Sequence, residues 1–176
     1  NTLLRNMTVD NNSIFGKNIT VNGDSLINKR LLTNKVRYIQ VGNNLSTGSW
    51  SKDWAIAELE AFDHNGKDVA LKKPVKLLKG VAHNGSNPGA ITDGNIKTNT
   101  WNQYFHGGGT NTQTLLEIDL GGEYYIKNIV LTSRWESNVP ERQNGTHVET
   151  LNSNKQRINI VHLGNFWNDF TKHIEF

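Results

Sequence analysis

Two arginines that bracket one short segment are the first candidates for chemistry in this sequence. The segment S-R-W-E-S-N-V-P-E-R-Q-N-G-T contains Arg134 and Arg142, with Trp135 beside the first of them. Its proline and its Asn-Gly pair predict a loop between strands. A guanidinium group is a planar fork of five N–H donors, so two of them on one loop could hold neighbouring oxygen atoms of a ligand. The alternative is that Glu136 and Glu141 form exposed ion pairs with these arginines, which would contribute little free energy.

The turn D-G-N, residues Asp93 to Asn95, is the second candidate. Calcium takes six to eight oxygen ligands from carboxylates, amides and backbone carbonyls. Asp93 and Asn95 offer side-chain oxygens, and Gly94 permits a tight turn that brings carbonyl groups together. The turn therefore predicts a structural calcium site. A plain Asp-Gly turn is the alternative.

The composition is that of a small, mildly basic protein without cysteine. The 176 residues suffice for one domain with a short extension, and five Trp, six Phe and four Tyr can form its core. The absence of cysteine excludes disulfides, a zinc–thiolate site and a Cys nucleophile. The formal net charge is +3, and the lysines cluster in L-K-K-P-V-K-L-L-K without interleaved aromatic residues. We therefore predict no nucleic-acid binding.

Hydropathy gives no sign of a membrane segment. No apolar run approaches the roughly 20 residues that a membrane span needs, so we predict no membrane insertion. The first residues, N-T-L-L-R-N-M-T, lack the apolar middle of a signal peptide. Because the chain starts at Asn1 rather than at a methionine, we expect it to be a segment of a longer protein.

The first thirty residues contain a repeat. Met7–Phe15 aligns with Ile19–Ile27 at an offset of 12 residues, and each copy has the pattern strand, Asx-containing turn, strand. Two such units cannot bury a core alone, so they need stacked neighbours from upstream or from other chains. The pattern resembles the N-G-D-type repeats of viral and phage fibre proteins, whose chains wind together as trimers. We predict that residues 1–35 form a β-repeat stem and neck that assembles as a homotrimer; a flexible leader with chance similarity is the alternative.

Residues 36–176 have the pattern of a sheet-rich domain. Short segments separated by Gly and Asn turns predict strands, and no segment predicts a helix longer than one or two turns. The expected strands are Val36–Val41, Trp54–Phe62, Val69–Leu71, Leu115–Leu120, Tyr125–Leu131, His147–Leu151 and Gln156–Leu163. The expected turns are Asp63–Gly66, Gly121–Gly122 and Asn152–Asn154. This spacing is typical of a β-sandwich or barrel, in which we expect Trp54 to pack rather than to bind a ligand.

Several segments of this domain match one known family. The sequence contains A-I-T-D-G-N from Ala90, T-N-T-W from Thr98, L-L-E-I-D-L-G from Leu115 and I-K-N-I-V-L-T-S-R from Ile126. Together these segments resemble the discoidin or F5/8 type C family, which implies an all-β jelly-roll sandwich of the galactose-binding-like type. V-R-Y-I-Q-V and W-A-I-A-E-L-E-A-F also resemble the family, but they close the domain in the usual order and open it here. The resemblance therefore implies a circularly permuted domain, which is feasible when the termini of a domain lie close together.

The resemblance extends to the calcium site. Many relatives hold a structural Ca²⁺ at the D-G-N turn, completed by the first glutamate of the A-E-x-E strand. That glutamate matches Glu58 in this sequence. The resemblance thus implies a Ca²⁺ site formed by Asp93, Asn95 and Glu58.

The resemblance also implies a sugar site. The fucose-binding branch of the family, the fucolectins, grips its sugar with one His and two Arg, which match His106, Arg134 and Arg142. Tyr104 and Trp135 are placed to cover an apolar face of the sugar. The spacings between the three residues are slightly longer than in fucolectins, and the cysteine pair between the arginines is absent. The identity of the sugar therefore stays open.

The order of repeat and lectin-like domain predicts a function. We predict the carbohydrate-binding head of a viral or phage surface attachment protein, on the virion surface or otherwise extracellular. Its partner would be a host cell-surface glycan, bound by several copies at once. We predict no enzymatic activity, because glycoside hydrolysis needs two carboxylates about 5–10 Å apart across a cleft, and of the strand pair Glu58 and Glu60 the resemblance assigns one to the metal. The remaining alternative is a structural or trimerisation cap of a fibre, without a ligand.

Overall fold

The chain divides into two compact units, Asn1–Thr33 and Asn34–Phe176. A computed structural model describes residues 20–21, 24–25, 35–43, 54–96, 102–108, 113–134, 143, 145–164 and 170–176. In the first unit, Thr20–Val21 (β1) and Asp24–Ser25 (β2) pair antiparallel. This hairpin falls on the second copy of the repeat, whereas the first copy, Met7–Phe15, lies outside the described residues.

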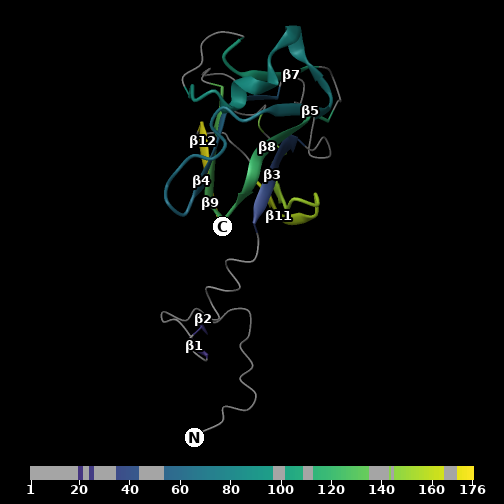
Figure 1. Cartoon of the computed structure of the whole chain (residues 1–176). Coiled ribbons are helices and arrows are strands. Elements are labelled where there is room, and N and C mark those ends of the chain that lie inside the picture. The colour runs from purple at the N-terminus through teal and green to yellow at the C-terminus, as the bar shows by residue number, and fades with distance from the viewer. Residues whose placement is uncertain are drawn as a thin grey trace, which may run out of the picture. The chain divides into compact units, whose positions relative to one another are not determined.

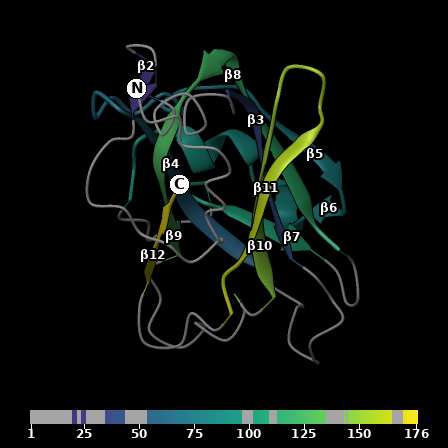
Figure 2. The same cartoon turned by 90° about the horizontal axis from the view of Figure 1, so that it is seen from below.

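The second unit is a β-sandwich of two antiparallel five-stranded sheets (Figures 1 and 2). The first sheet has the order β11-β10-β3-β8-β5 and the second has the order β12-β9-β4-β7-β6. The strands of the first sheet are β3 (Val36–Asn43), β5 (Val75–Lys79), β8 (Leu115–Tyr124), β10 (Thr146–Leu151) and β11 (Arg157–His162). Those of the second sheet are β4 (Ala55–Asp63), β6 (Val81–Ala82), β7 (Phe105–Gly108), β9 (Ile126–Ser133) and β12 (Thr171–Glu175). The predicted all-β sandwich is confirmed.

Among the described residues, two short 3₁₀ segments have both ends defined, and Gln143 is also in 3₁₀ conformation. The two segments are η3 (His83–Gly85) and η4 (Pro88–Thr92), which connect β6 to β7. Neither exceeds two turns, as the sequence predicted.

The core forms where the inner faces of the two sheets meet. Alternate residues of a strand point to one face, and the two inner faces interdigitate. The central strands supply side chains with no exposed surface: Ile39, Val41, Leu59, Ala61, Leu116, Ile118, Leu120, Ile129 and Leu131. Burying one Leu, Ile or Val side chain contributes about 1.5–3 kcal/mol relative to leaving it exposed. The alternation of apolar residues along the four central strands is therefore the main determinant of the sandwich.

The predicted strand Val69–Leu71 is wrong. Asp68 forms only an isolated bridge to Phe62, and its carboxylate accepts the N–H groups of Ala61 and Ala70 at 3.0 and 2.9 Å. A side-chain acceptor of this kind competes with the hydrogen bonds of a strand. Lys72 then takes a φ of +58°, and β5 begins only at Val75, after Pro74.

The predicted turn at Gly121–Gly122 is also misplaced. β8 continues through both glycines to Tyr124, and β9 begins at Ile126. Gly121 has a φ of +74°, and its N–H donates to Asp119 Oδ1 at 2.9 Å. The glycines form an irregularity inside the strand, at which the register with β3 shifts.

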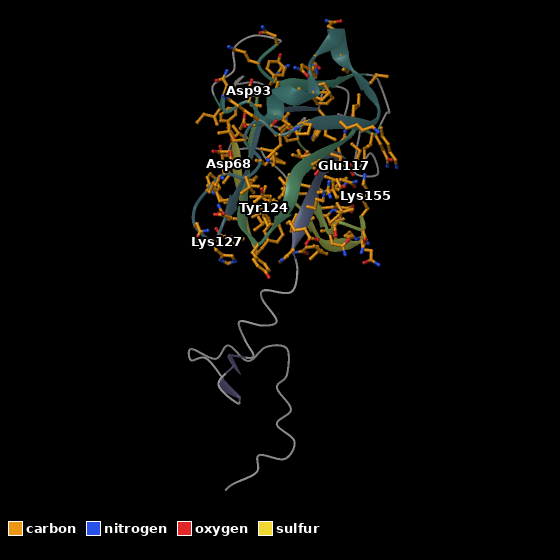
Figure 3. The ribbon with its side chains drawn as sticks, in the orientation of Figure 1. Asp68, Asp93, Glu117, Tyr124, Lys127 and Lys155 are labelled. Carbon is orange, nitrogen blue, oxygen red and sulfur yellow. The ribbon has the colours of Figure 1, made fainter. Side chains whose placement is uncertain are left out.

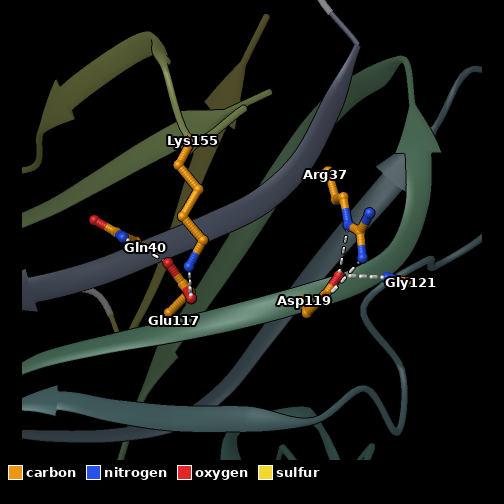
Figure 4. Close-up of polar contacts among 6 residues, drawn as sticks. All are labelled: Arg37, Gln40, Glu117, Asp119, Gly121 and Lys155. Carbon is orange, nitrogen blue, oxygen red and sulfur yellow. Dashed lines mark hydrogen bonds and ion pairs between the residues drawn. The ribbon is translucent and has the colours of Figure 1, made fainter. Parts of the chain in front are cut away.

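Polar pairs on β3 and β8 fix their register (Figure 4). Arg37 donates to Asp119 at 3.2 Å, and Gln40 donates to Glu117 at 2.8 Å. Lys155, from the confirmed hairpin turn between β10 and β11, reaches the buried Glu117 at 2.8 Å. Because Glu117 is mostly buried, its two donors are needed to satisfy the carboxylate.

The first and last described residues of the sandwich, Lys35 and Phe176, both lie beside the turn between β8 and β9. Lys35, just before β3, places its Nζ atom 5.6 Å from the centre of the Tyr125 ring. The N–H of Phe176 donates to the Lys127 carbonyl at 3.0 Å. Figure 1 shows the C-terminus near the start of β3. The two chain ends of the sandwich therefore lie close together, whereas the permuted strand order stays a prediction.

Trp54 links the two sheets at the opposite end. Its indole is fully buried, and Nε1 donates to Thr146 Oγ1 at 2.9 Å. The Thr146 hydroxyl in turn donates to the Gln143 carbonyl at 2.6 Å, and the Gln143 amide donates to the Ala55 carbonyl. The start of β4 in the second sheet is thereby joined to the start of β10 in the first.

Thr146→Val tests this link. We expect a loss of about 1–3 kcal/mol in the free energy of unfolding, because the buried Trp54 N–H and the Gln143 carbonyl lose their partner. Thr150→Val, on the same strand, is the matched control: Thr150 Oγ1 is buried and has no hydrogen-bond partner among the described residues. That variant should be neutral or stabilising. Urea unfolding of both variants measures the difference, and equal destabilisation would contradict the assigned role of the link.

Candidate functional site

Three of the predicted sugar-contact residues converge at one end of the second sheet. Ala55 of β4 lies opposite His106 of β7, and Ile56 lies opposite Ser133 of β9. Arg134 directly follows Ser133, and Tyr104 directly precedes β7. The pairing of β4 with its two neighbours therefore brings Tyr104, His106 and Arg134 together.

Arg134 is held by the ring and the hydroxyl of Tyr104. Its Nη1 donates to the Tyr104 hydroxyl at 3.3 Å, and its guanidinium carbon lies 5.4 Å from the ring centre. Tyr104 itself packs against Ala55 and Ala57 of β4 and is almost fully buried. Since only 6% of Arg134 is exposed, its guanidinium is packed in one orientation.

His106 is anchored through its backbone. Its N–H donates to Ser86 Oγ at 3.0 Å, and its carbonyl accepts the Ser86 hydroxyl at 2.8 Å. Its imidazole is buried and lies 4.6 Å from the ring of His83 and 6.3 Å from that of Tyr104, measured between ring centres. The sequence did not mark His83, because it belongs to no motif; the pairing of β6 with β7 places it here.

Most of the predicted arginine loop lies outside the described residues. Trp135 and Arg142 lie outside the described residues. Of the predicted sugar-binding residues, the structure therefore describes only Arg134, His106 and Tyr104.

The three predicted calcium ligands also lie together. Glu58 of β4 is fully buried, and each of its carboxylate oxygens accepts the Gly94 N–H at 3.2 Å. Asp93 Oδ1 accepts the Asn95 N–H at 2.8 Å, which closes the D-G-N turn over Glu58. Gly94 has a φ of +89°, so a residue with a Cβ would be strained there. Figure 3 shows Asp93 toward the end of the sandwich opposite Tyr124 and Lys127.

The charge around Glu58 suits a cation. Burial raises the pKa of the Glu58 carboxyl to about 8, and the charges of Asp93 and Glu60 add to that effect. Hydrogen bonds from the backbone of Gly94 and Asn95 oppose it. Within the described residues no group of three or more His, Cys, Asp or Glu could hold a metal ion, so further ligands would have to be amide or carbonyl oxygens. Glu58, Asp93 and Asn95 offer oxygen donors, the type of ligand that calcium takes.

The two candidate sites are neighbours along β4. Tyr104 packs on Ala57, and Glu58 is the next residue of the strand. A bulge in the pairing of β4 with β9 falls between Ile56 and Glu58. The segment that carries the D-G-N turn and the segment that carries Tyr104 therefore contact successive residues of one strand.

Comparisons with known proteins return no match. No protein-family model, no curated protein and no solved structure matches the chain. None of the described helices is long and apolar enough to cross a membrane.

The buried Glu58 predicts how the stability of the metal-free protein depends on pH. The pKa of Glu58 in the folded protein, about 8, lies above its ordinary value of 4.5. The folded state therefore binds this proton more tightly than the unfolded chain, and the stability present below pH 4.5 is lost as the pH rises toward 8. One such group contributes a slope of up to about 1.4 kcal/mol per pH unit.

Urea unfolding across this pH range, in the presence of a chelator, measures the slope. Glu58→Gln should flatten it, whereas Glu60→Gln on the same strand should retain the contribution of Glu58. An unchanged slope in Glu58→Gln would show that other groups cause the pH dependence.

Proposed function

We propose that the Asn34–Phe176 unit is a discoidin-like, carbohydrate-binding domain that recognises host cell-surface glycans. The observation that carries this proposal is the cluster of Arg134, Tyr104 and His106 at one end of the second sheet. Of these residues, His106 and Arg134 are the ones that match the sugar-binding branch of the discoidin family. These two lie far apart in the sequence, and both β7 and β9 pair with β4.

The chemistry of the cluster suits a sugar. A guanidinium donates several hydrogen bonds in one plane, which matches adjacent hydroxyl oxygens. The contact with Tyr104 holds that plane before a ligand arrives, so little conformational entropy is lost on binding. The aromatic rings beside it offer apolar faces of the kind against which sugars pack.

Calcium is the proposed structural cofactor. Glu58, Asp93 and Asn95 would hold it, and it would supply positive charge beside the buried carboxylate of Glu58. The hydrogen bonds from Gly94 to Glu58 hold the D-G-N turn against β4, one residue along the strand from Ala57, on which Tyr104 packs. The site would therefore brace the sugar site from the same strand.

The wider biological setting follows from the order of the two units. We propose that the first unit belongs to a trimeric β-repeat stem and that the sandwich is the head of a viral or phage attachment protein. A circularly permuted jelly-roll would allow β3 to follow the stem directly while the end of β12 lies nearby. Three or more heads on one surface would raise a weak affinity for a single glycan by multivalency.

One observation favours a second candidate, a structural cap without a ligand. His106 and Arg134 are only 2% and 6% exposed, so both side chains already have extensive protein contacts. In this alternative the cluster of Arg134, Tyr104 and His106 only stabilises the end of the second sheet at which it lies. The two candidates differ in whether the purified protein binds any glycan.

Calcium binding is tested by thermal unfolding. We expect Ca²⁺ to raise the Tm of the chelator-treated protein, because a ligand at 100 times its Kd stabilises the folded state by about 2.7 kcal/mol. Glu58→Gln should abolish this shift and Glu60→Gln should retain it. An equal rise in Tm on adding Ca²⁺ to both variants would show that the ion binds at a site other than Glu58.

Sugar binding is tested on a glycan array with the whole chain in Ca²⁺. We expect selective binding that Arg134→Lys weakens by about tenfold or more, because lysine keeps the charge but loses the planar fork. Arg157→Lys is the control, since Arg157 lies on β11 with an exposed side chain. Absence of binding to every glycan by the folded protein would favour the structural cap.

A further inference from the structure

A cavity of about 160 Å³ lies at the same end of the sandwich but in the first sheet. Its walls come from the end of β3, the end of β5, the start of β10 and the residues at the start of β8; Figure 2 labels all four strands. The lining residues are Asn43, Lys79, Gln113, Thr114, Leu115 and His147. None of them belongs to the Arg134 cluster or to the D-G-N turn.

Close backbone packing builds the walls. A Cβ atom on Gly42 would lie 2.6 Å from the Thr114 carbonyl oxygen and 3.3 Å from Cε1 of His147. Gly80, with a φ of +88°, would place a Cβ 2.9 Å from the Gln113 carbonyl oxygen. These glycines allow β3 and β5 to approach the start of β8, so the cavity is formed by the packed backbone.

Asn43 lines the cavity and carries a buried donor. Only 2% of the residue is exposed, and its Oδ1 accepts the Thr114 N–H at 2.7 Å. That bond fixes the orientation of the amide, which assigns the other atom as the NH₂ group. Nδ2 is buried and has no hydrogen-bond partner among the described residues. A buried donor without a partner is destabilising, and an acceptor on a ligand would remove that destabilisation.

The charge of the lining favours a negative ligand. Lys79 is cationic and makes no ion pair with any of the described residues. No carboxylate is among the described residues that line the cavity. Glu149 lies beside His147: its Oε1 is 3.9 Å from Nε2 of His147 and 3.6 Å from Nη1 of Arg157.

The size of the cavity sets the size of the ligand. A cavity of about 150 Å³ holds a benzene molecule. This cavity therefore admits one six-membered ring, or a carboxylate group together with part of the ring that carries it. A neutral sugar would match the amide donor but would gain nothing from Lys79.

We propose that this cavity binds the carboxylate of an acidic sugar residue, with Asn43 Nδ2 and Lys79 Nζ as the donors. The carboxylate site stands on the cavity itself, whereas the choice of a sugar acid over another small acid rests on the proposed carbohydrate-binding function. His147 and Gln113 complete the polar wall. The site is separate from the Arg134 cluster, so a glycan with an acidic residue would have two independent contacts.

The test is an NMR titration of the ¹⁵N-labelled full chain with glucuronate, galacturonate and N-acetylneuraminate, with glucose and acetate as comparison ligands. We expect at least one sugar acid to shift the Asn43 side-chain NH₂ and Thr114 N–H signals, and glucose to bind at least about tenfold more weakly. Asn43→Asp should abolish binding, because it keeps the acceptor for the Thr114 N–H but replaces the donor with a negative oxygen. Lys79→Gln should weaken binding, and Lys76→Gln, exposed on the same strand, should leave it unchanged.

The outcomes separate this proposal from the proposed function. Binding that persists in Arg134→Lys supports a distinct site even if the Arg134 cluster binds no sugar. No shift with any of the three sugar acids overturns the proposal. Acetate binding as tightly as the sugar acids overturns the assignment to sugars, and equal effects of Lys79→Gln and Lys76→Gln overturn the role of Lys79. If Asn43→Asp does not fold, the lysine pair decides the result.

Discussion

The arrangement of both candidate sites depends on one buried interaction, the hydrogen bond from the Trp54 indole to Thr146 across the two sheets. Hydrophobic burial packs two sheets face to face but does not fix how their ends align, because it has no direction. The indole N–H, fully buried, must find a partner, and the one it finds is on the other sheet. The chain of bonds through Gln143 returns to Ala55, the residue on which Tyr104 packs. The position of the Arg134 cluster is thus set relative to the first sheet as well as to its own.

The second constraint is the close approach of backbone around Thr114. Gly42, Gly80 and Gly107 each lie so close to the Gln113–Thr114 segment that an added Cβ would fall within 3.0 Å of one of its atoms. Gly107 belongs to β7 and directly follows His106, while Thr114 lines the cavity of the first sheet. Side chains at these glycines would push β3, β5 and β7 away from β8. The cavity and the His106 backbone therefore share one packed junction, and a change at Thr114 should affect both.

The sequence predicted those features that local patterns encode. The long strands follow from apolar alternation, and the D-G-N turn with Glu58 follows from a motif whose members the fold brings together. Glycines misled the prediction at one point: Gly121–Gly122 suggested a turn but lies within β8. The strand continues there because of its pairing partner, which lies elsewhere in the sequence. His83 and the cavity could not be predicted for the same reason: Asn43, Lys79 and His147 share no motif and meet only through strand order.

The charges at this end of the sandwich are divided between the two sheets. Glu58 is a buried carboxyl on the second sheet, and the exposed Asp93 lies in the turn above it, an arrangement that suits a cation. Lys79 and the Asn43 amide place donors on the first sheet, where they suit an anion. The protein between them is a poor dielectric. Near neutral pH the Glu58 carboxyl of the metal-free protein keeps its proton, so a bound Ca²⁺ would displace that proton and leave this sheet more positive by about one charge. Calcium would then strengthen binding of an acidic sugar without contacting it, and it would do so less at high salt, where such long-range fields are screened.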